Sequence, residues 1–179
     1  MNFQRARSSE EKNKRMNQIK KAAIKLFDHC IYQDITLSKI GKEIDFTRAN
    51  LYKYISSKED IYLYILVDEL NLLIKEMNEK LMLEAPIHGN DFSYIWATIL
   101  TNHPRFMKLL SILFTIIEPN STLEALVEFK NSLQEGKQSI YIIIQHNFKS
   151  MNHEDILKLL DYAFSLIISW YQFSYHAET

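Results

Sequence analysis

The sequence predicts an all-α protein with an N-terminal three-helix domain and a C-terminal helical bundle, about nine helices in all. The 179 residues include only three glycines and three prolines, and a sheet protein of this size needs more of them at its turns. Apolar residues make up 47% and charged residues 24%, which is typical of a chain that folds into one or two compact domains. We therefore expect helices joined by short polar loops.

The first helix is expected to begin at Ser8, because Ser8 and Glu11 have the spacing of a capping box. The residues before it, 1–7, are predicted to form a mobile basic arm. Helical spacing of apolar residues supports the helix. The stripe consists of Ile19, Ala23, Leu26, Phe27 and Cys30.

Two short helices follow, at about 36–44 and 47–55. Thr36 and Thr47 are suitable N-cap residues for them, and Asp45-Phe46 forms the turn between them. A turn this short makes two helices cross steeply, which is the helix-turn-helix arrangement. The side chains expected to meet at the crossing are Ile40, Ile44, Phe46, Leu51 and Ile55.

The second short helix has one buried face and one face free for DNA. With Leu51 and Ile55 buried, Ala49, Asn50 and Lys53 lie on the opposite side, and Arg48 lies in the first turn. Arginine pairs with the guanine edge, asparagine with adenine, and an alanine methyl with the thymine methyl. We expect phosphate contacts from Thr36, Thr47, Tyr52, Tyr54 and Lys58. Lys39 is a further candidate for a DNA contact.

Charge supports this interpretation only weakly. Residues 1–60 carry a net charge of +5 and residues 61–179 a net charge of −6, so the N-terminal part is the one that would attract a polyanion. Ordinary surface variation gives the same asymmetry, and the tyrosines would also suit a purely structural bundle. Arg5 and Arg7 are within reach of a minor groove, although an unordered tail is the alternative.

The remaining chain is expected to be helical and to form a second domain. Ser57 and Asp60 repeat the capping-box spacing at the start of a long helix, 58–81. The segment 85–90 is the clearest linker. We place the domain boundary between residues 58 and 59. The later helices are expected at 91–101, from Pro104 to about 118, at 122–148 and at 154–175.

The stretch 36–58 resembles the DNA-binding domain of the tetracycline-repressor (TetR) family, and the resemblance covers about residues 10–65. Three departures concern the turn and the core: Ile44-Asp45 stands where the family often has Ala-Gly, Gly41 where it has alanine, and Ile55 where it has phenylalanine. Asp45 tolerates a left-handed backbone, whereas Gly41 is expected to loosen its helix slightly. The matching residues are Thr36, Ile40, Phe46-Thr47, Asn50–Ile55 and Ser57–Ile61.

The resemblance implies a repressor that binds a palindromic operator as a homodimer, with a C-terminal domain for dimerisation and effector binding. The last two helices are expected to form the dimer, since each has more apolar surface than one side of a small bundle needs. The alternative is that both are internal core helices. Their apolar residues are Leu123, Leu126, Val127, Leu133, Ile140, Tyr141, Ile144 and Phe148, then Ile156, Leu159, Leu160, Ala163, Leu166, Ile167, Trp170, Tyr171 and Phe173.

An effector pocket is predicted within the C-terminal domain, with a small lipophilic or aromatic ligand. Apolar walls with a few polar groups are typical of small-molecule sites, although each of these residues singly also suits a plain core. The candidate lining residues are Leu66, Leu70, Tyr94, Trp96, Phe106, Leu110, Phe114 and Tyr141, with His103 and Glu118 as polar anchors.

Other functional classes lack their signatures. The sequence has no P-loop, GxGxxG, HExxH or GxSxG motif, so we expect no enzyme, no cofactor and no metal. With Cys30 the single cysteine, and with no apolar stretch that suits a signal or a membrane span, we expect a cytoplasmic protein. A DNA-binding regulator controlled by a partner protein instead of a small ligand remains the alternative.

Overall fold

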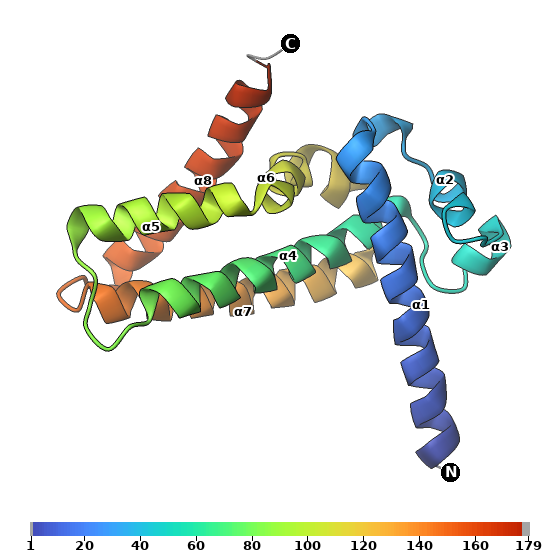
Figure 1. Ribbon diagram of the computed structural model, residues 1–179, viewed down its shortest axis with the longest axis horizontal. Coiled ribbons are helices and arrows are strands. Elements are labelled where there is room, and N and C mark those ends of the chain that lie inside the picture. Colours follow the sequence, from blue (N-terminus) through green and yellow to red (C-terminus); the bar gives the residue numbers. More distant parts are fainter. Residues whose placement is uncertain (1, 177–179) are drawn as a thin grey trace. The chain divides into compact units, whose positions relative to one another are not determined.

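The computed structural model describes the backbone of residues 2–176 and the side chains of residues 10–171 (Figure 1). Helices account for nearly all of this part of the chain, and it contains no strand, so the predicted all-α class is confirmed. Three shorter segments accompany the α-helices: the 3₁₀ turns η1 (Tyr32–Asp34) and η3 (Glu118–Asn120) and the π segment η2 (Leu113–Ile117). The α-helices are α1 (Asn2–His29), α2 (Leu37–Lys42), α3 (Arg48–Leu51), α4 (Lys58–Leu81), α5 (Gly89–Asn102), α6 (Pro104–Ser111), α7 (Leu123–Asn147) and α8 (His153–His176).

Contacts divide the chain into two compact units. Unit 1 holds the residues up to Ile65 together with Ile117–Leu126, and unit 2 holds Leu66–Ile116 and the residues from Val127 on. Both α4 and α7 contribute to each unit. The domain boundary expected between residues 58 and 59 separates parts that would fold independently. Contacts alone do not test this, so the boundary stays a prediction.

The expected start of the first helix was wrong. α1 begins at Asn2, so residues 2–7 are helical where an arm was predicted, and Ser8 lies inside the helix rather than at its cap. No glycine or proline interrupts residues 2–29, and nothing in that stretch stops a helix from extending toward the N-terminus.

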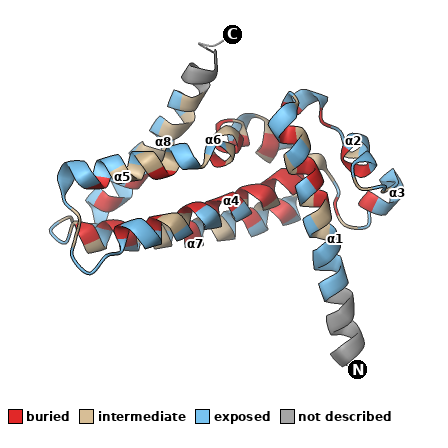
Figure 2. Cartoon of the chain, in the orientation of Figure 1, coloured by how far each residue is buried: buried red, intermediate tan, exposed pale blue. Residues whose placement is uncertain are grey.

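Aromatic side chains form the core of unit 1. The ring of Tyr62 lies 5.3 Å from that of Phe27 and 5.1 Å from that of Tyr32. The Tyr62 hydroxyl donates to the carbonyl of Ala23 at 3.1 Å, and the Tyr32 hydroxyl donates to Glu59 at 3.2 Å. Burial raises the pKa of both tyrosines, so they remain neutral hydrogen-bond donors. These contacts join α1, η1 and α4, whose buried faces are visible in Figure 2.

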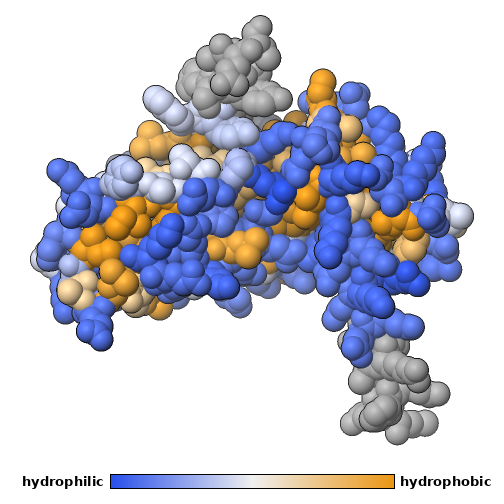
Figure 3. Space-filling model, in the orientation of Figure 1, coloured by the Kyte–Doolittle hydropathy of each residue, from blue (hydrophilic) through white to orange (hydrophobic). Residues whose placement is uncertain are grey.

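In unit 2, α4 and α7 run side by side in parallel. Near Leu70 the two helices approach closely: a Cβ on Gly136 would lie 2.7 Å from Leu70 Cδ2 and 3.3 Å from Ile74 Cδ1. Further along, the side-chain amide of Asn147 donates to the carbonyl of Leu81 at 2.9 Å. Apolar residues also remain on the surface of unit 2, around α5 and the adjoining part of α4 (Figure 3).

Charged and polar side chains fix the junction of α5 and α6 to α4. His103 Nε2 lies 2.9 Å from Glu76 Oε2, and Asn102 donates to the same carboxylate at 3.0 Å. Hydrogen bonds from Lys80, Asn102 and His103 lower the pKa of Glu76 to about 2, so the clamp persists until the pH falls well below the usual range of a glutamate. About two helical turns earlier on α4, the buried Glu69 pairs with Arg105 at 2.7 Å.

Other predicted boundaries differ by a few residues. α3 ends at Leu51, and residues 52–54 continue as a turn where helix to Ile55 was expected. α6 ends at Ser111 and is extended by η2 and η3, where one helix was expected to reach about residue 118. Over the described residues, no helix combines the length and apolar character needed to span a membrane.

Candidate nucleic-acid interface

The two short helices of unit 1 are capped as the sequence predicted. Thr36 Oγ1 accepts a hydrogen bond from the backbone N–H of Lys39 at 3.2 Å. Thr47 Oγ1 accepts one from the N–H of Asn50, also at 3.2 Å. Each cap satisfies one of the free N–H groups at a helix start. These hydrogen bonds fix the residues at which α2 and α3 begin. The start of α3 in turn determines which of its side chains are exposed.

The turn between α2 and α3 depends on the backbone conformation of Asp45 and on the lack of a side chain at Gly41. Asp45 adopts the left-handed conformation, with φ at 55°, as its tolerance of that region predicted. The N–H of Phe46 then donates back to the carbonyl of Gly41 at 2.9 Å. A Cβ on Gly41 would lie 2.6 Å from the carbonyl oxygen of Phe46. Gly41 therefore permits a close approach, which gives this glycine a function beyond loosening α2.

Replacing Asp45 with valine should destabilise the folded protein by about 1–2 kcal/mol, because a β-branched side chain is strained at positive φ. Glycine at the same position should leave the stability unchanged within about 1 kcal/mol, since it adopts this conformation without a Cβ clash. The measurement is urea unfolding of the three proteins. Equal stability of the valine and glycine variants would contradict a left-handed turn.

The exposed face of α3 carries the residues expected to read DNA. Leu51 and Ile55 are buried, with 0% and 5% of their surfaces exposed. Arg48, Ala49 and Asn50 are all exposed. The structure therefore leaves the three residues expected at base edges accessible. Thr36, Lys39, Thr47, Tyr52 and Lys53 are also exposed, and Tyr54 is half-buried.

Arg48 and Tyr52 form a pair on this face. The guanidinium donates from Nε and Nη2 to the Tyr52 hydroxyl, at 3.1 and 2.8 Å, and its carbon lies 5.4 Å from the ring centroid. The hydroxyl accepts hydrogen bonds from the Nε–Nη2 edge of the guanidinium. The donors on the Nη1–Nη2 edge are not used by this pair. This pair was not predicted from the sequence, although its i,i+4 spacing on a helix was the available signal.

Lys58 does not join these residues, and its expected phosphate contact needs correction. Its ammonium donates to the carbonyls of Tyr32 and Ile35 at 3.0 and 2.8 Å and lies 4.4 Å from the Tyr32 ring centroid. Only 18% of its side chain is exposed, and burial lowers its pKa. Lys58, at the start of α4, therefore stabilises the backbone around η1. The side chains of Arg5 and Arg7, expected near a minor groove, lie outside the described residues.

The residues predicted to bind an effector are only partly brought together. Two cavities lie within unit 2, and Leu70, Trp96 and Phe106 line the smaller one, while Trp96 also lines the larger one. The other predicted residues line neither cavity. Tyr94 is 75% exposed, His103 is held by Glu76, Tyr141 bonds to His153 at 3.0 Å, Leu66 and Leu110 are buried, Phe114 is exposed and Glu118 is half-buried.

Comparison with known protein families gives a match for the C-terminal part of the chain, which follows the helix-turn-helix. Residues 67–179 match the model of the tetracyclin repressor-like C-terminal domain. The chain belongs to the TetR family of transcriptional regulators. A comparison with curated proteins finds no match.

A solved structure has a similar fold over most of the chain. The transcriptional regulator of the TetR/AcrR family from Thermobifida fusca YX-ER1 superimposes with a TM-score of 0.61. It covers 89% of this chain and 85% of its own, at 18% sequence identity, so it establishes a shared fold. TetR-family proteins are DNA-binding regulators, and no cluster of three or more metal-ligating side chains occurs among the described residues.

Proposed function

We propose that this TetR-family regulator is a repressor that binds a palindromic operator as a homodimer and is released by a small effector. The observation that carries the DNA-binding part is the exposed face of α3, where Arg48, Ala49 and Asn50 are accessible while Leu51 is buried. This face combines a guanine-binding, a thymine-binding and an adenine-binding side chain. The caps and the turn hold it in one orientation.

The phosphate contacts are proposed to surround this face. Thr36 and Thr47 stand at helix N-termini, where unpaired N–H groups favour anions. Lys39 and Lys53 are exposed cations, and the Tyr52 and Tyr54 hydroxyls add hydrogen-bond donors. Because Lys58 is already bonded to two carbonyls, we leave it out of the DNA contacts.

Dimerisation is proposed through α7 and α8. Along α8, Tyr162, Leu166 and Trp170 follow one another at i,i+4 spacing and are 67%, 66% and 75% exposed. On α7, Val127 and Ile142 are about half exposed. A large apolar stripe of this kind usually marks an interface, and a two-fold pairing would present two copies of α3 to half-sites about 34–36 Å apart.

Replacing Leu166 with glutamate should therefore convert the dimer into a monomer at micromolar concentration, because the charge would be buried at the interface. Ser165→Glu is the matched control, since its side chain lies about 100° around α8 from Leu166 and should leave the dimer intact. Sedimentation equilibrium measures both. A Leu166→Glu protein that still sediments as a dimer would place the interface elsewhere.

Control by a small molecule is proposed because unit 2 contains two largely apolar cavities. α4 supplies Leu70, Leu73 and Met77 to one of them, and the same helix continues into unit 1. A ligand that favours one arrangement of α4 would shift the population of DNA-competent dimers. The second candidate is a regulator controlled by a partner protein, and an effector that leaves operator affinity unchanged would favour it.

The deciding experiment for DNA binding is selection of bound sequences from random DNA, followed by genome mapping of the enriched site. We expect a palindrome with half-sites one helical turn apart. Gel-shift titration should then separate this site from random DNA by about 10³-fold or more at moderate salt. A protein that enriches no sequence, or binds both DNAs equally, would overturn the proposed function.

A further inference from the structure

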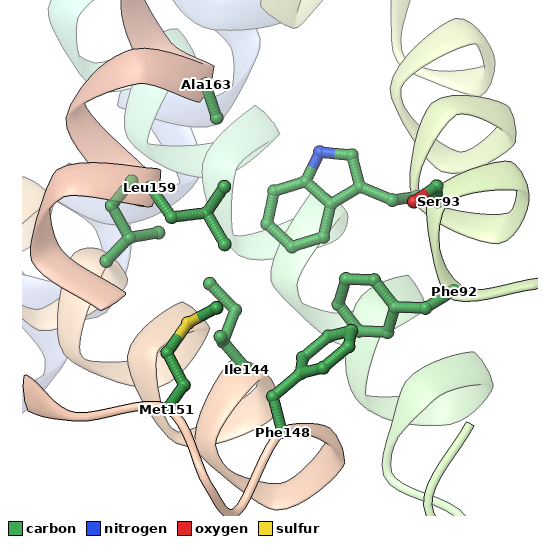
Figure 4. A pocket seen from close by; sticks show the side chains of 9 residues that line it. Phe92, Ser93, Ile144, Phe148, Met151, Leu159 and Ala163 are labelled. Carbon is green, nitrogen blue, oxygen red and sulfur yellow. The ribbon is translucent and has the colours of Figure 1, made fainter. Parts of the chain in front are cut away.

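The larger cavity of unit 2 lies among α5, α7, the α7–α8 loop and α8, and its volume is about 220 Å³. Aromatic rings form one wall: Phe92 lies 4.8 Å from Phe148, edge to face, and 5.7 Å from Trp96. Figure 4 shows Phe92 and Phe148 next to each other, across a gap from Leu159 of α8. Such a wall suits an aromatic ring, because offset and edge-to-face contacts between rings are favourable.

The smaller cavity, of about 50 Å³, adjoins the larger one. Trp96, Leu160 and Ala163 line both, so the two spaces meet at these three residues. Beyond them the walls are formed mostly by aliphatic and aromatic side chains, including Leu70 and Met77 of α4, and Lys137 is the one charged residue. The combined space is therefore wide at one end and narrow at the other. It suits a ring that carries a short chain.

The largely apolar lining of the site disfavours an ionic ligand. None of the nine residues that line the larger cavity is charged, and Ser93 supplies its one hydroxyl. Ser93 donates to the carbonyl of Gly89 at 3.2 Å, which leaves its oxygen free to accept a hydrogen bond. In the smaller cavity, Lys137 already lies 3.6 Å from Asp161 and 5.8 Å from the centroid of Phe164. A buried formal charge would find no partner here and would lose its hydration.

We propose that the two cavities form one site for an uncharged aromatic amphiphile, with its ring against Phe92 and Phe148. Its hydroxyl donates to Ser93, and a short alkyl chain passes Trp96 toward Leu70. The proposal rests on the proposed function only in treating this ligand as the effector; binding itself needs no DNA. Alkylphenols are suitable probes, since they are neutral at pH 7 and combine a ring, a donor and a chain.

The first test is calorimetric titration of the wild-type protein with three probes of one skeleton: 4-butylphenol, 4-butylbenzoate and 4-butylbenzylammonium. We expect the phenol to bind at least tenfold more tightly than either ion. Affinity should rise about fourfold for each methylene from 4-ethylphenol to 4-butylphenol, because each added methylene is buried in the narrow part. Binding of the benzoate equal to that of the phenol, or affinity independent of chain length, would overturn the proposal.

Variants then locate the site. Ala163→Phe fills the junction of the two cavities and should abolish binding, whereas Tyr94→Ala, on an exposed part of α5, should leave it unchanged. Ser93→Ala should reduce the preference for 4-butylphenol over butylbenzene about three- to tenfold. Trp170→Phe leaves Trp96 as the single tryptophan, so its fluorescence should change on titration with 4-butylphenol. Unchanged affinity in Ala163→Phe, or no change in Trp96 fluorescence, would place the ligand elsewhere.

Gel shift separates this inference from the proposed function. If 4-butylphenol binds unit 2 but does not release the operator, the site is confirmed and the effector role fails. If the protein binds its operator but no alkylphenol, the regulator stands and this inference fails.

Discussion

Replacing Arg48 with alanine should weaken binding to the selected operator by about 1–3 kcal/mol, with the loss concentrated at one base position. The reason is geometric. The Tyr52 hydroxyl takes the Nε and Nη2 hydrogens of Arg48, so the Nη1–Nη2 edge remains for a guanine, whose O6 and N7 accept two hydrogen bonds. In the alanine variant that base should become interchangeable, because no other exposed side chain of α3 supplies a planar pair of donors.

The Tyr52→Phe variant tests whether the pair positions Arg48. If the hydroxyl only met a phosphate, its loss would weaken all DNA equally. Because it also holds the guanidinium, we expect a smaller loss than in Arg48→Ala, with part of it at the same base. In the double variant Arg48→Ala/Tyr52→Phe the base-specific loss should not increase further, which a double-mutant cycle measures as coupling between the two residues.

Lys53→Ala is the matched control on the same face. It removes an exposed cation, so binding to the operator and to random DNA should fall together and the salt dependence should flatten. Gel-shift titrations of each variant on the operator, on its single-base changes and on random DNA give all the required affinities. A uniform loss in Arg48→Ala would mean that Arg48 contacts only phosphate.

Local signals explain most of what the sequence predicted correctly in unit 1. Thr36, Thr47 and Ser57 each act on N–H groups within three residues, so the caps were visible as short patterns. The left-handed Asp45 was equally local. Buried positions at helical spacing then identified the exposed face of α3 without any tertiary information.

Long-range contacts were not predictable from such patterns. Lys58 looked like a phosphate ligand because it begins a helix next to the motif, yet its ammonium bonds to carbonyls more than twenty residues earlier. The cavity wall of Phe92, Phe148 and Leu159 brings three separate segments together. Helical periodicity states which side of each helix is buried, but it does not state which helices face each other.

Asp60 combines a local and a long-range contact, and its loss should have the largest effect on stability. The side chain is only 2% exposed. Its Oδ2 accepts from the N–H of Ser57 at 3.2 Å, in the predicted capping box, while its Oδ1 accepts from the N–H of Thr122 at 2.8 Å. The carboxylate thus joins the start of α4 to the residue that precedes α7, within unit 1.

Asp60→Ala should destabilise the protein by about 2–4 kcal/mol, because two partly buried N–H groups lose their acceptor and a small cavity remains at a buried position. That is a large part of the 5–15 kcal/mol typical of a folded domain. Ser57→Ala removes only the hydroxyl that accepts from the Asp60 N–H and should cost about 1 kcal/mol. Urea unfolding of both variants measures the difference. If Asp60→Ala is no less stable than Ser57→Ala, the bond to Thr122 contributes nothing, and the start of α7 is held in place by apolar packing alone.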